Sequence, residues 1–359
     1  MSGPDPAQRG AARPDAARPD AARPGAARPG AARPGAARAI VLRENGGPEK
    51  LLWETVDVGE PGQGDLLVRH TAIGVNFHDT YVRSGLYKTL QLPGIPGVEA
   101  AGVVEKTGPG VTAFVPGDRI CYVDQSYGAY SERRVLPASL AFRLPDAISD
   151  ETAASLAVKG LTACMLLRHT RRVLRGETIL IHAAAGGVGQ SLVHWAKHLG
   201  ARVIATVGSI EKAKTARGCG ADEVILYRQE NFVERVATFT HGRGVDVVYD
   251  SVGADTFSGS LDCLAYFGTL VNFGQSSGPV PPFAISRLAA RSNAVVRPIV
   301  FHYIRERSAR DAMVEETFKM VQAGVLTPRI GLRLPLSRAA DAHTALESRT
   351  TTGTVILTV

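Results

Sequence analysis

The chain has 359 residues, of which 45% are hydrophobic and 21% are charged. This composition is typical of a soluble globular protein, and the length suffices for two or three domains. No apolar run approaches the ~20 residues that a membrane span requires, and the N-terminus lacks the basic-then-apolar order of a secretory signal. We therefore expect a cytoplasmic protein with no membrane partner.

The net charge of +7 is unevenly distributed along the chain. Residues 1–38 hold seven arginines and three aspartates, so this segment contributes +4 and leaves +3 on the remainder. A globular part so close to neutrality gives no reason to expect a nucleic-acid partner. The four cysteines lie more than forty residues apart in sequence. This spacing fits neither a metal finger nor a CxxC redox motif, and we expect reduced thiols.

Residues 1–37 consist largely of a five-residue repeat, AARPD or AARPG. Proline at every fifth position prevents a regular helix or sheet, and the repeat has no large apolar side chain to bury. We expect a disordered extension here, with a polybasic tether as the alternative. The aspartates and prolines of the repeat argue against a mitochondrial presequence.

Two patterns of secondary structure follow in chain order. From Ala39 to about Ser139, short β-rich segments alternate with Gly-Gly, Pro-Gly and Gly-Pro turns, which predicts a mostly antiparallel, barrel-like domain. From about Asp150, apolar strands are separated by helix-length spacers, which indicates a parallel sheet built from βαβ units. Six strands fit a doubly wound dinucleotide-binding fold. We expect them at 178–184, 202–207, 223–227, 245–250, 268–273 and 293–300.

The C-terminal part is expected to contain one helix, over 309–324, and a last segment, GTVILTV, that returns to the first domain.

A glycine-rich turn joins the first of these strands to a helical pattern. Aligned on G-x-G-x-x-G, residues 184–189 read AAGGVG, so alanine replaces the first glycine. Because a strand precedes the turn and a helix follows it, backbone N–H groups at the helix N-terminus are expected to bind the phosphates of a dinucleotide. A tight strand-to-helix turn without a ligand is the alternative.

The end of the second strand favours NADPH over NADH. NAD-specific folds place an acidic residue there to bind the ribose hydroxyl. This chain instead has neutral residues, Gly208 and Ser209, followed by Lys212, with Tyr227 and Arg228 at the end of the next strand. These residues suit a 2′-phosphate. Glu211 is the competing candidate for the ribose, although it falls within the expected helix.

Many segments of the chain resemble the NADPH:quinone oxidoreductases related to zeta-crystallin, in the medium-chain dehydrogenase/reductase superfamily. Among them are AIGVNFHDTYVRSGLY, PGVEAAGVV, VPGDRI, GAYSE, VKGLTA, HAAAGGVGQSLVHWAKHLGA, FGQSSG and ALESRTTTG. The resemblance implies a GroES-like catalytic domain over 38–157 and 302–359, and a Rossmann NADPH-binding domain over 158–301. It also implies a homodimer or a higher oligomer.

The resemblance carries a set of cofactor-binding residues onto this chain. Asn76 and Tyr81 are expected to line the nicotinamide pocket, and Arg349 to reach the cofactor phosphates or the interdomain cleft. The full expected set is Asn76, Thr162, Gly186, Gly187, Val188, Gly208, Ser209, Lys212, Tyr227, Ser251, Phe273, Gly274, Ser276 and Arg349.

No metal is expected at the catalytic site. In zinc alcohol dehydrogenases of the superfamily, a cysteine and the histidine of a Gly-His-Glu motif hold the metal. Here Val98 stands between Gly97 and Glu99, and VNFHDT occupies the position of the cysteine. Zinc needs three or four N, S or O ligands in compatible positions. His194 and His198 have a metal-like i, i+4 spacing, but they lack a catalytic Glu and are expected only to share a helix face.

Hydride transfer without a metal requires a pocket for a planar acceptor and a donor for its developing oxyanion. We expect reduction of a quinone, with Tyr81, Asn76 and Tyr87 as catalytic candidates and Arg83 near them. Tyr81 either acts as an acid or only shapes the pocket. An enone or 2-enoyl-thioester reductase is the alternative activity, and an RNA-binding or structural role is the non-enzymatic one.

One further residue needs a partner. The stretch GIPGVEAAG surrounds Glu99 with glycines and small apolar residues, where an ionised acid is costly unless it is paired. We expect Glu99 to pair structurally with an arginine or with backbone N–H groups.

Overall fold

The computed structural model describes residues 35–359 of the chain. Its first strand, β1 (Ala36–Leu42), begins within the extension that was predicted for residues 1–37. That extension was therefore predicted slightly too long, because β1 pairs with β2 (Leu51–Asp57) from Ala36 onward. The rest of the predicted disordered segment lies outside the described residues.

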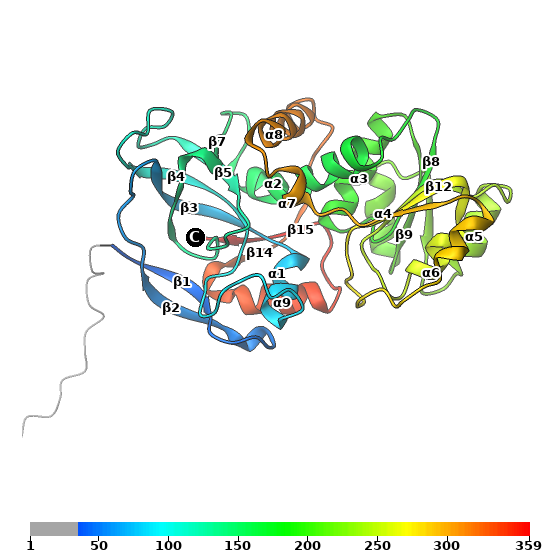
Figure 1. Ribbon diagram of the computed structural model, residues 1–359, viewed down its shortest axis with the longest axis horizontal. Coiled ribbons are helices and arrows are strands. Elements are labelled where there is room, and N and C mark those ends of the chain that lie inside the picture. Colours follow the sequence, from blue (N-terminus) through cyan, green and yellow to red (C-terminus); the bar gives the residue numbers. More distant parts are fainter. Residues whose placement is uncertain (1–34) are drawn as a thin grey trace, which may run out of the picture. The chain divides into compact units, whose positions relative to one another are not determined.

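The β-rich part contains a seven-stranded sheet in addition to the β1–β2 pair. Its order is β14-β15-β3-β4-β5-β7, and β6 pairs with β3. As predicted, the C-terminal segment returns to this sheet: β15 runs antiparallel to β3, with Val355 opposite Val75, and Figure 1 shows the red strand beside the blue one. The strands are β3 (Asp65–Val75), β4 (Glu99–Thr107), β5 (Arg119–Val123), β6 (Arg133–Pro137), β7 (Ala141–Arg143), β14 (Ile330–Pro335) and β15 (Thr354–Thr358).

The second sheet is parallel, and its six strands lie in the order β10-β9-β8-β11-β12-β13. Numbered from β8, this is the 3-2-1-4-5-6 order of the doubly wound dinucleotide fold, so the predicted fold class is confirmed. The strands are β8 (Thr178–Ile181), β9 (Arg202–Val207), β10 (Glu223–Leu226), β11 (Val245–Asp250), β12 (Leu264–Asn272) and β13 (Ala294–Val296).

The last strand was predicted wrongly at its end. The expected strand over 293–300 stops at Val296, and α7 (Val300–Tyr303) begins where it should have continued. The Arg297 side chain turns back to β12, where its Nη1 donates to Asn272 Oδ1 at 2.6 Å. Pro298, the next residue, has no N–H for a strand ladder, so pairing with β12 ends there.

Helices cover both faces of the parallel sheet. Ile179 and Ile181 of β8 pack in the same core as α3 (Gly187–His198) and α4 (Ile210–Gly218). Leu180, between them, packs in a second core with α5 (Phe232–Phe239) and α6 (Phe257–Asp262). This alternation follows from the period of two along a strand. Figure 1 shows the two helix layers flanking β8, β9 and β12.

Two further helices position the site. The first, α1 (Phe77–Ser84), directly follows β3. The second, α2 (Asp150–Cys164), contacts β3 and β4 of one sheet and α3 beside the other, and it continues into a π-helical turn, Met165–Thr170. The predicted helix near the C-terminus is α8 (Arg307–Gln322), whereas α9 (Ala339–Glu347) was not predicted.

Short 3₁₀ turns complete the fold at Pro48–Lys50, Ala138–Leu140, Ile285–Ala290 and Leu336–Arg338. Among residues 35–359, no helix is long and apolar enough to cross a membrane.

Candidate active site

A cavity of about 690 Å³ is lined by loops that follow strands of both sheets and by the helices α1, α2 and α3. It brings together all but one of the residues predicted for the site. The exception is Ser209, which caps α4 by accepting a hydrogen bond from the Lys212 N–H at 3.3 Å. The predicted residues in the cavity wall are Asn76, Tyr81, Tyr87, Thr162, Gly186, Gly187, Val188, Gly208, Lys212, Tyr227, Ser251, Phe273, Gly274, Ser276 and Arg349.

The glycine-rich turn forms one side of this cavity. Gly186 is the N-cap of α3 and offers no side-chain acceptor to the N–H groups of the first helical turn. Those donors lie at the positive end of the helix and face a cavity, an arrangement that favours an anion. Gly189 allows the helix to pack closely on the turn, because a Cβ there would lie 2.4 Å from the Ala183 carbonyl oxygen.

Basic side chains gather at the end of the cavity beyond β9. Burial lowers the pKa of Lys212, and the positive charges of Arg228 and Arg349 lower it further. The Lys212 Nζ donates to the Arg349 carbonyl oxygen at 2.7 Å. Tyr227 completes this group, because its hydroxyl lies close above Gly208. Positive charges this close repel one another, and a bound dianionic group would relieve that repulsion. The cluster is therefore suited to a phosphate.

Asn76 stands at the junction of β3 and α1. Its backbone N–H donates to the Asp79 carboxylate at 2.8 Å, which caps the helix and fixes the direction of the Asn76 side chain. The Asn76 Nδ2 then donates to Glu99 Oε1 at 2.7 Å. The amide is therefore held in one orientation at the cavity wall.

Glu99 is fully buried at the start of β4. Its carboxylate accepts three hydrogen bonds, of which the first comes from the Asn76 amide. Lys159 Nζ lies 2.9 Å from its Oε1, and the Val158 N–H lies 2.5 Å from its Oε2. The expected backbone donor is present, but the charged partner is a lysine and not an arginine. Gly74 makes room for the carboxylate, since a Cβ there would lie 2.2 Å from Glu99 Oε1.

Lys159 is a functional candidate that the sequence reasoning missed. It is 5% exposed, lies on α2 and lines the cavity. The only signal for it was its place in the apolar segment AVKGLTA, where a buried lysine requires an anion. The sequence could not show that this anion is Glu99, sixty residues earlier.

Tyr81 and Tyr87 also line the cavity, with ring centroids 5.1 Å apart in an edge-to-face arrangement. The Tyr81 hydroxyl accepts the Gln275 N–H at 3.2 Å, and burial raises its pKa to about 12. This hydroxyl therefore keeps its proton throughout the neutral range. The hydroxyl accepts one hydrogen bond from the backbone and still has its own proton to donate.

The arginine that lies beside the tyrosines is Arg297, and not Arg83 as predicted. Its Nη2 lies 3.3 Å from the Tyr87 hydroxyl, while its Nη1 is held by Asn272. Arg83 was expected near the tyrosines, but its side chain is buried away from the cavity and pairs with Glu347 at 2.6 Å. It points there because α1 presents Tyr81 and Arg83 on different faces.

Behind Asn76 lies a buried polar chain. Asp79 accepts from the Tyr130 hydroxyl at 3.0 Å, and that hydroxyl also lies 3.1 Å from His343 Nε2. Burial raises the pKa of Asp79 to about 7, whereas burial lowers the pKa of His343 to about 3. Near neutrality His343 is therefore uncharged and Asp79 is partly protonated, because burial favours the neutral form of each group.

Comparisons with known proteins agree with this architecture. An alcohol dehydrogenase GroES-like domain matches residues 62–146, and a zinc-binding dehydrogenase domain matches residues 187–317. A quinone oxidoreductase of Pseudomonas aeruginosa is 47% identical over 313 residues, which cover 87% of this chain and 96% of the relative. A 2-haloacrylate reductase of Burkholderia sp is 44% identical over 326 residues, which cover 89% and 98%.

The solved structure of Escherichia coli quinone oxidoreductase complexed with NADPH is also similar. Its TM-score is 0.87 at 43% identity, and the match covers 90% of this chain and 100% of that chain.

The chain belongs to the quinone oxidoreductase family. This confirms the resemblance inferred from its motifs, and it places the chain among the oxidoreductases of the medium-chain dehydrogenase/reductase superfamily.

The name of the matched zinc-binding dehydrogenase domain implies a zinc ion. His78 and His182 line the cavity, but residues 35–359 bring no group of three possible zinc ligands together there. The positions expected for its ligands hold Val98, which is fully buried, and the Asn76 amide, which already donates to Glu99. Neither supplies the sulfur or imidazole nitrogen that zinc prefers. The Lys159 ammonium beside Glu99 would repel a second cation. In this member of the quinone oxidoreductase family, Glu99 is instead bound by the Asn76 amide and the Lys159 ammonium.

Two other motifs behave as ordinary structure. His194 is half-buried and His198 is exposed on α3, and the described part of the chain places no third ligand beside them. The GQSSG segment, residues 274–278, matches the G-x-S-x-G pattern of a nucleophile elbow. It follows β12 as a turn without a helix, so it does not form such an elbow. Instead Ser276 donates its N–H to the Ser251 carbonyl at 3.2 Å, which shapes the cavity wall.

Proposed function

We propose that this protein reduces quinones with NADPH, by hydride transfer within this cavity and without a metal ion. The observation that carries the proposal is the Asn76–Glu99–Lys159 hydrogen-bonded group. It includes the segments where zinc alcohol dehydrogenases hold their metal, and its Asn76 and Lys159 line the same cavity as Tyr81 and Tyr87. A quinone is a strong acceptor that needs orientation and a hydrogen-bond donor more than it needs a Lewis acid.

The residues present fit NADPH. We propose that the N–H groups around Gly186 and Gly187 bind the diphosphate, and that Lys212, Tyr227 and Arg349 bind the 2′-phosphate. Asn76, Ser251, Phe273, Gly274 and Ser276 would hold the nicotinamide end. Bound NADPH would supply the hydride. The Glu99 carboxylate keeps the Asn76 amide from rotating, so that the cavity wall is organised before ligands bind.

Tyr81 supplies a positioned proton in this proposal. Its ring offers a flat apolar surface to a planar acceptor, and its hydroxyl can donate to the acceptor oxygen. Because its pKa is about 12, it acts as a hydrogen-bond donor to the developing oxyanion more than as a full proton donor.

Steady-state reduction of a quinone panel, including 1,2-naphthoquinone, tests this function directly. We expect NADPH oxidation that depends on added quinone, that persists after treatment with a strong chelator, and that prefers NADPH to NADH. Quinone-independent NADPH oxidation, or activity that chelation removes and zinc restores, would contradict the proposal.

A second candidate function is the reduction of an α,β-unsaturated carbonyl compound. The position of Arg297 supports this function. A guanidinium at the cavity wall beside Tyr87 is a suitable partner for a substrate carboxylate. One relative at 44% identity is a 2-haloacrylate reductase, which makes an unsaturated acid a reasonable acceptor. Comparing kcat/KM for 2-chloroacrylate, a crotonyl thioester and 1,2-naphthoquinone decides between the activities.

The organisation of the protein is also proposed here. We infer a GroES-like catalytic domain over 38–157 and 302–359 and a Rossmann domain over 158–301. The seven-stranded sheet and most of the β1–β2 pair fall in the first domain, and the parallel sheet falls in the second. We further propose a cytoplasmic homodimer that binds no nucleic acid. Light scattering of the full chain, and a search for salt-sensitive RNA binding with and without residues 1–38, test these two points.

A further inference from the structure

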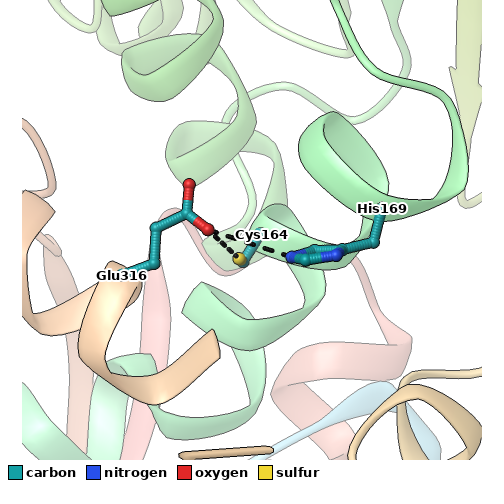
Figure 2. A group of neighbouring side chains, drawn as sticks. All are labelled: Cys164, His169 and Glu316. Carbon is teal, nitrogen blue, oxygen red and sulfur yellow. Dashed lines mark hydrogen bonds and ion pairs between the residues drawn. The ribbon is translucent and has the colours of Figure 1, made fainter. Parts of the chain in front are cut away.

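A cluster of three side chains lies on the side of α2 that faces α8. Cys164 ends α2, His169 lies in the π-helical turn that follows, and Glu316 lies on α8 (Figure 2). One potential ligand atom of each residue, a sulfur, an imidazole nitrogen and a carboxylate oxygen, lies within 4.8 Å of the other two. None of the three residues lines the proposed cofactor cavity.

Two of the three distances between the ligand atoms are close to those around a tetrahedral ion. Cys164 Sγ lies 3.5 Å from Glu316 Oε2, and His169 Nε2 lies 3.8 Å from the same oxygen. A tetrahedral zinc ion with ordinary bond lengths separates a sulfur from an oxygen ligand by about 3.6 Å, and a nitrogen from an oxygen ligand by about 3.4 Å. Small rotations of the exposed His169 ring would close the remaining difference.

Two local features create the cluster. An α-helix would place Cys164 and His169, five residues apart, about 140° from each other around the axis. The π-helical turn closes its hydrogen bonds between residues five apart and so brings both side chains to one side. Gly160 lets the helices approach, because a Cβ there would lie 2.6 Å from Thr317 Cγ2 of α8.

The Glu316 carboxylate is already oriented for this role. Arg168 Nε donates to its Oε1 at 2.8 Å, which leaves Oε2 directed at Cys164 and His169 (Figure 2). Hydrogen bonds of this kind hold the ligands of known metal sites in place. The Arg168 charge also weakens attraction for a cation, so the site is expected to exchange its metal.

We propose that Cys164, His169 and Glu316 form a zinc-binding site that is separate from the cofactor cavity. A mixed sulfur, nitrogen and oxygen set is typical of zinc, and the fourth position is left for water or a solute. When the zinc–sulfur bond forms, the thiol proton of Cys164 passes to the buffer, and no group is oxidised or reduced. The bound ion would tie the end of α2 to α8.

Binding is tested on the full chain after chelation and removal of the chelator, by competition of Zn²⁺ with a chromophoric zinc indicator. We expect one zinc per chain, and at least a tenfold loss of affinity in His169→Gln and in Glu316→Gln. His198→Gln is the matched control, since His198 is an exposed histidine on α3. Residues 1–34 contain neither histidine nor cysteine, so they offer no competing site of this type.

Cobalt substitution identifies the sulfur. The Co²⁺-loaded protein should show a thiolate-to-cobalt charge-transfer band that is lost in Cys164→Ser and kept in Cys219→Ser. Because Cys164 is buried, circular dichroism and the melting temperature of each metal-free variant confirm that it still folds. Zinc should raise the melting temperature of the parent chain by about 3 °C and leave that of His169→Gln unchanged. No zinc binding by the parent chain, or equal binding by His169→Gln and Glu316→Gln, would overturn the proposal.

Discussion

Lys159 Nζ of α2 lies 2.9 Å from Glu99 Oε1 of β4, and both side chains are withdrawn from solvent. This pair joins two segments that lie sixty residues apart. Lys159 lines the cavity, and its counter-charge, Glu99, is fully buried and does not line it. Glu99 in turn holds the Asn76 amide. The pair therefore links the stability of the fold to the organisation of the site.

Glu99→Gln should destabilise the protein by about 3 kcal/mol, because it leaves the Lys159 ammonium buried without its counter-charge. Urea unfolding at pH 7 measures this effect. Glu60→Gln is the control, since Glu60 pairs with Lys106 on the exposed surface and its loss should cost under ~1 kcal/mol. Unchanged stability together with lost turnover would show that Glu99 acts on the substrate and does not serve mainly as a structural partner.

Tyr81→Phe should lower kcat for a quinone about tenfold, which corresponds to one hydrogen bond to the developing oxyanion. Both proteins should show the same pH dependence of kcat between about pH 6 and 9, because the pKa of Tyr81 is about 12 and its hydroxyl does not titrate there. Tyr87→Phe tests the neighbouring hydroxyl. An unchanged kcat in Tyr81→Phe at every pH would mean that Tyr81 only shapes the cavity.

Lys212→Gln should reduce kcat/KM with NADPH about tenfold and leave kcat/KM with NADH nearly unchanged, because only NADPH carries the 2′-phosphate. Lys214→Gln provides the matched comparison, since Lys214 lies on the exposed side of the same helix. If the parent chain prefers NADH, or if Lys212→Gln affects both cofactors equally, the assignment of this basic cluster to the phosphate is wrong.

The pH dependence of stability should reveal Asp79. Its pKa is about 7 in the fold, against an ordinary value near 3.8, so the folded state binds a proton more tightly than the unfolded chain does. Its contribution to stability is therefore present at low pH and is lost as the pH rises from about 4 to 7, by up to about 4 kcal/mol. Above about pH 7 no further change is expected from this group.

The Asp79→Asn variant isolates that contribution, because asparagine keeps an acceptor for the Asn76 N–H and does not titrate. The difference in unfolding free energy between the parent and Asp79→Asn should shift in favour of the variant between about pH 4 and pH 7. The buried His343 is common to both proteins, and its lowered pKa acts equally in each. A difference that is constant with pH would show that Asp79 is ionised in the fold throughout.

The sequence alone determined the parts of this protein that depend on local pattern. Helix-length spacers between apolar strands predicted the parallel six-stranded sheet, because a strand and a helix have different hydrophobic periods. The turn over 184–189 predicted a phosphate site, since the strand and helix that it joins are its immediate neighbours. Val98, in the place of the histidine before Glu99, led to the prediction that no zinc is bound there, and this stays a prediction.

Only the tertiary structure decided which distant groups meet. The sequence indicated that Glu99 needs a partner, but α2 delivers Lys159 and the Val158 N–H, where an arginine was expected. Arg297, whose place was not predicted from the sequence, lies beside Tyr87, whereas helix α1 turns Arg83 inward to Glu347. The meeting of Cys164 with Glu316 depends on a π-helical turn and a close helix crossing. Such contacts depend on how elements pack, because local propensity does not specify the partner of a buried charge.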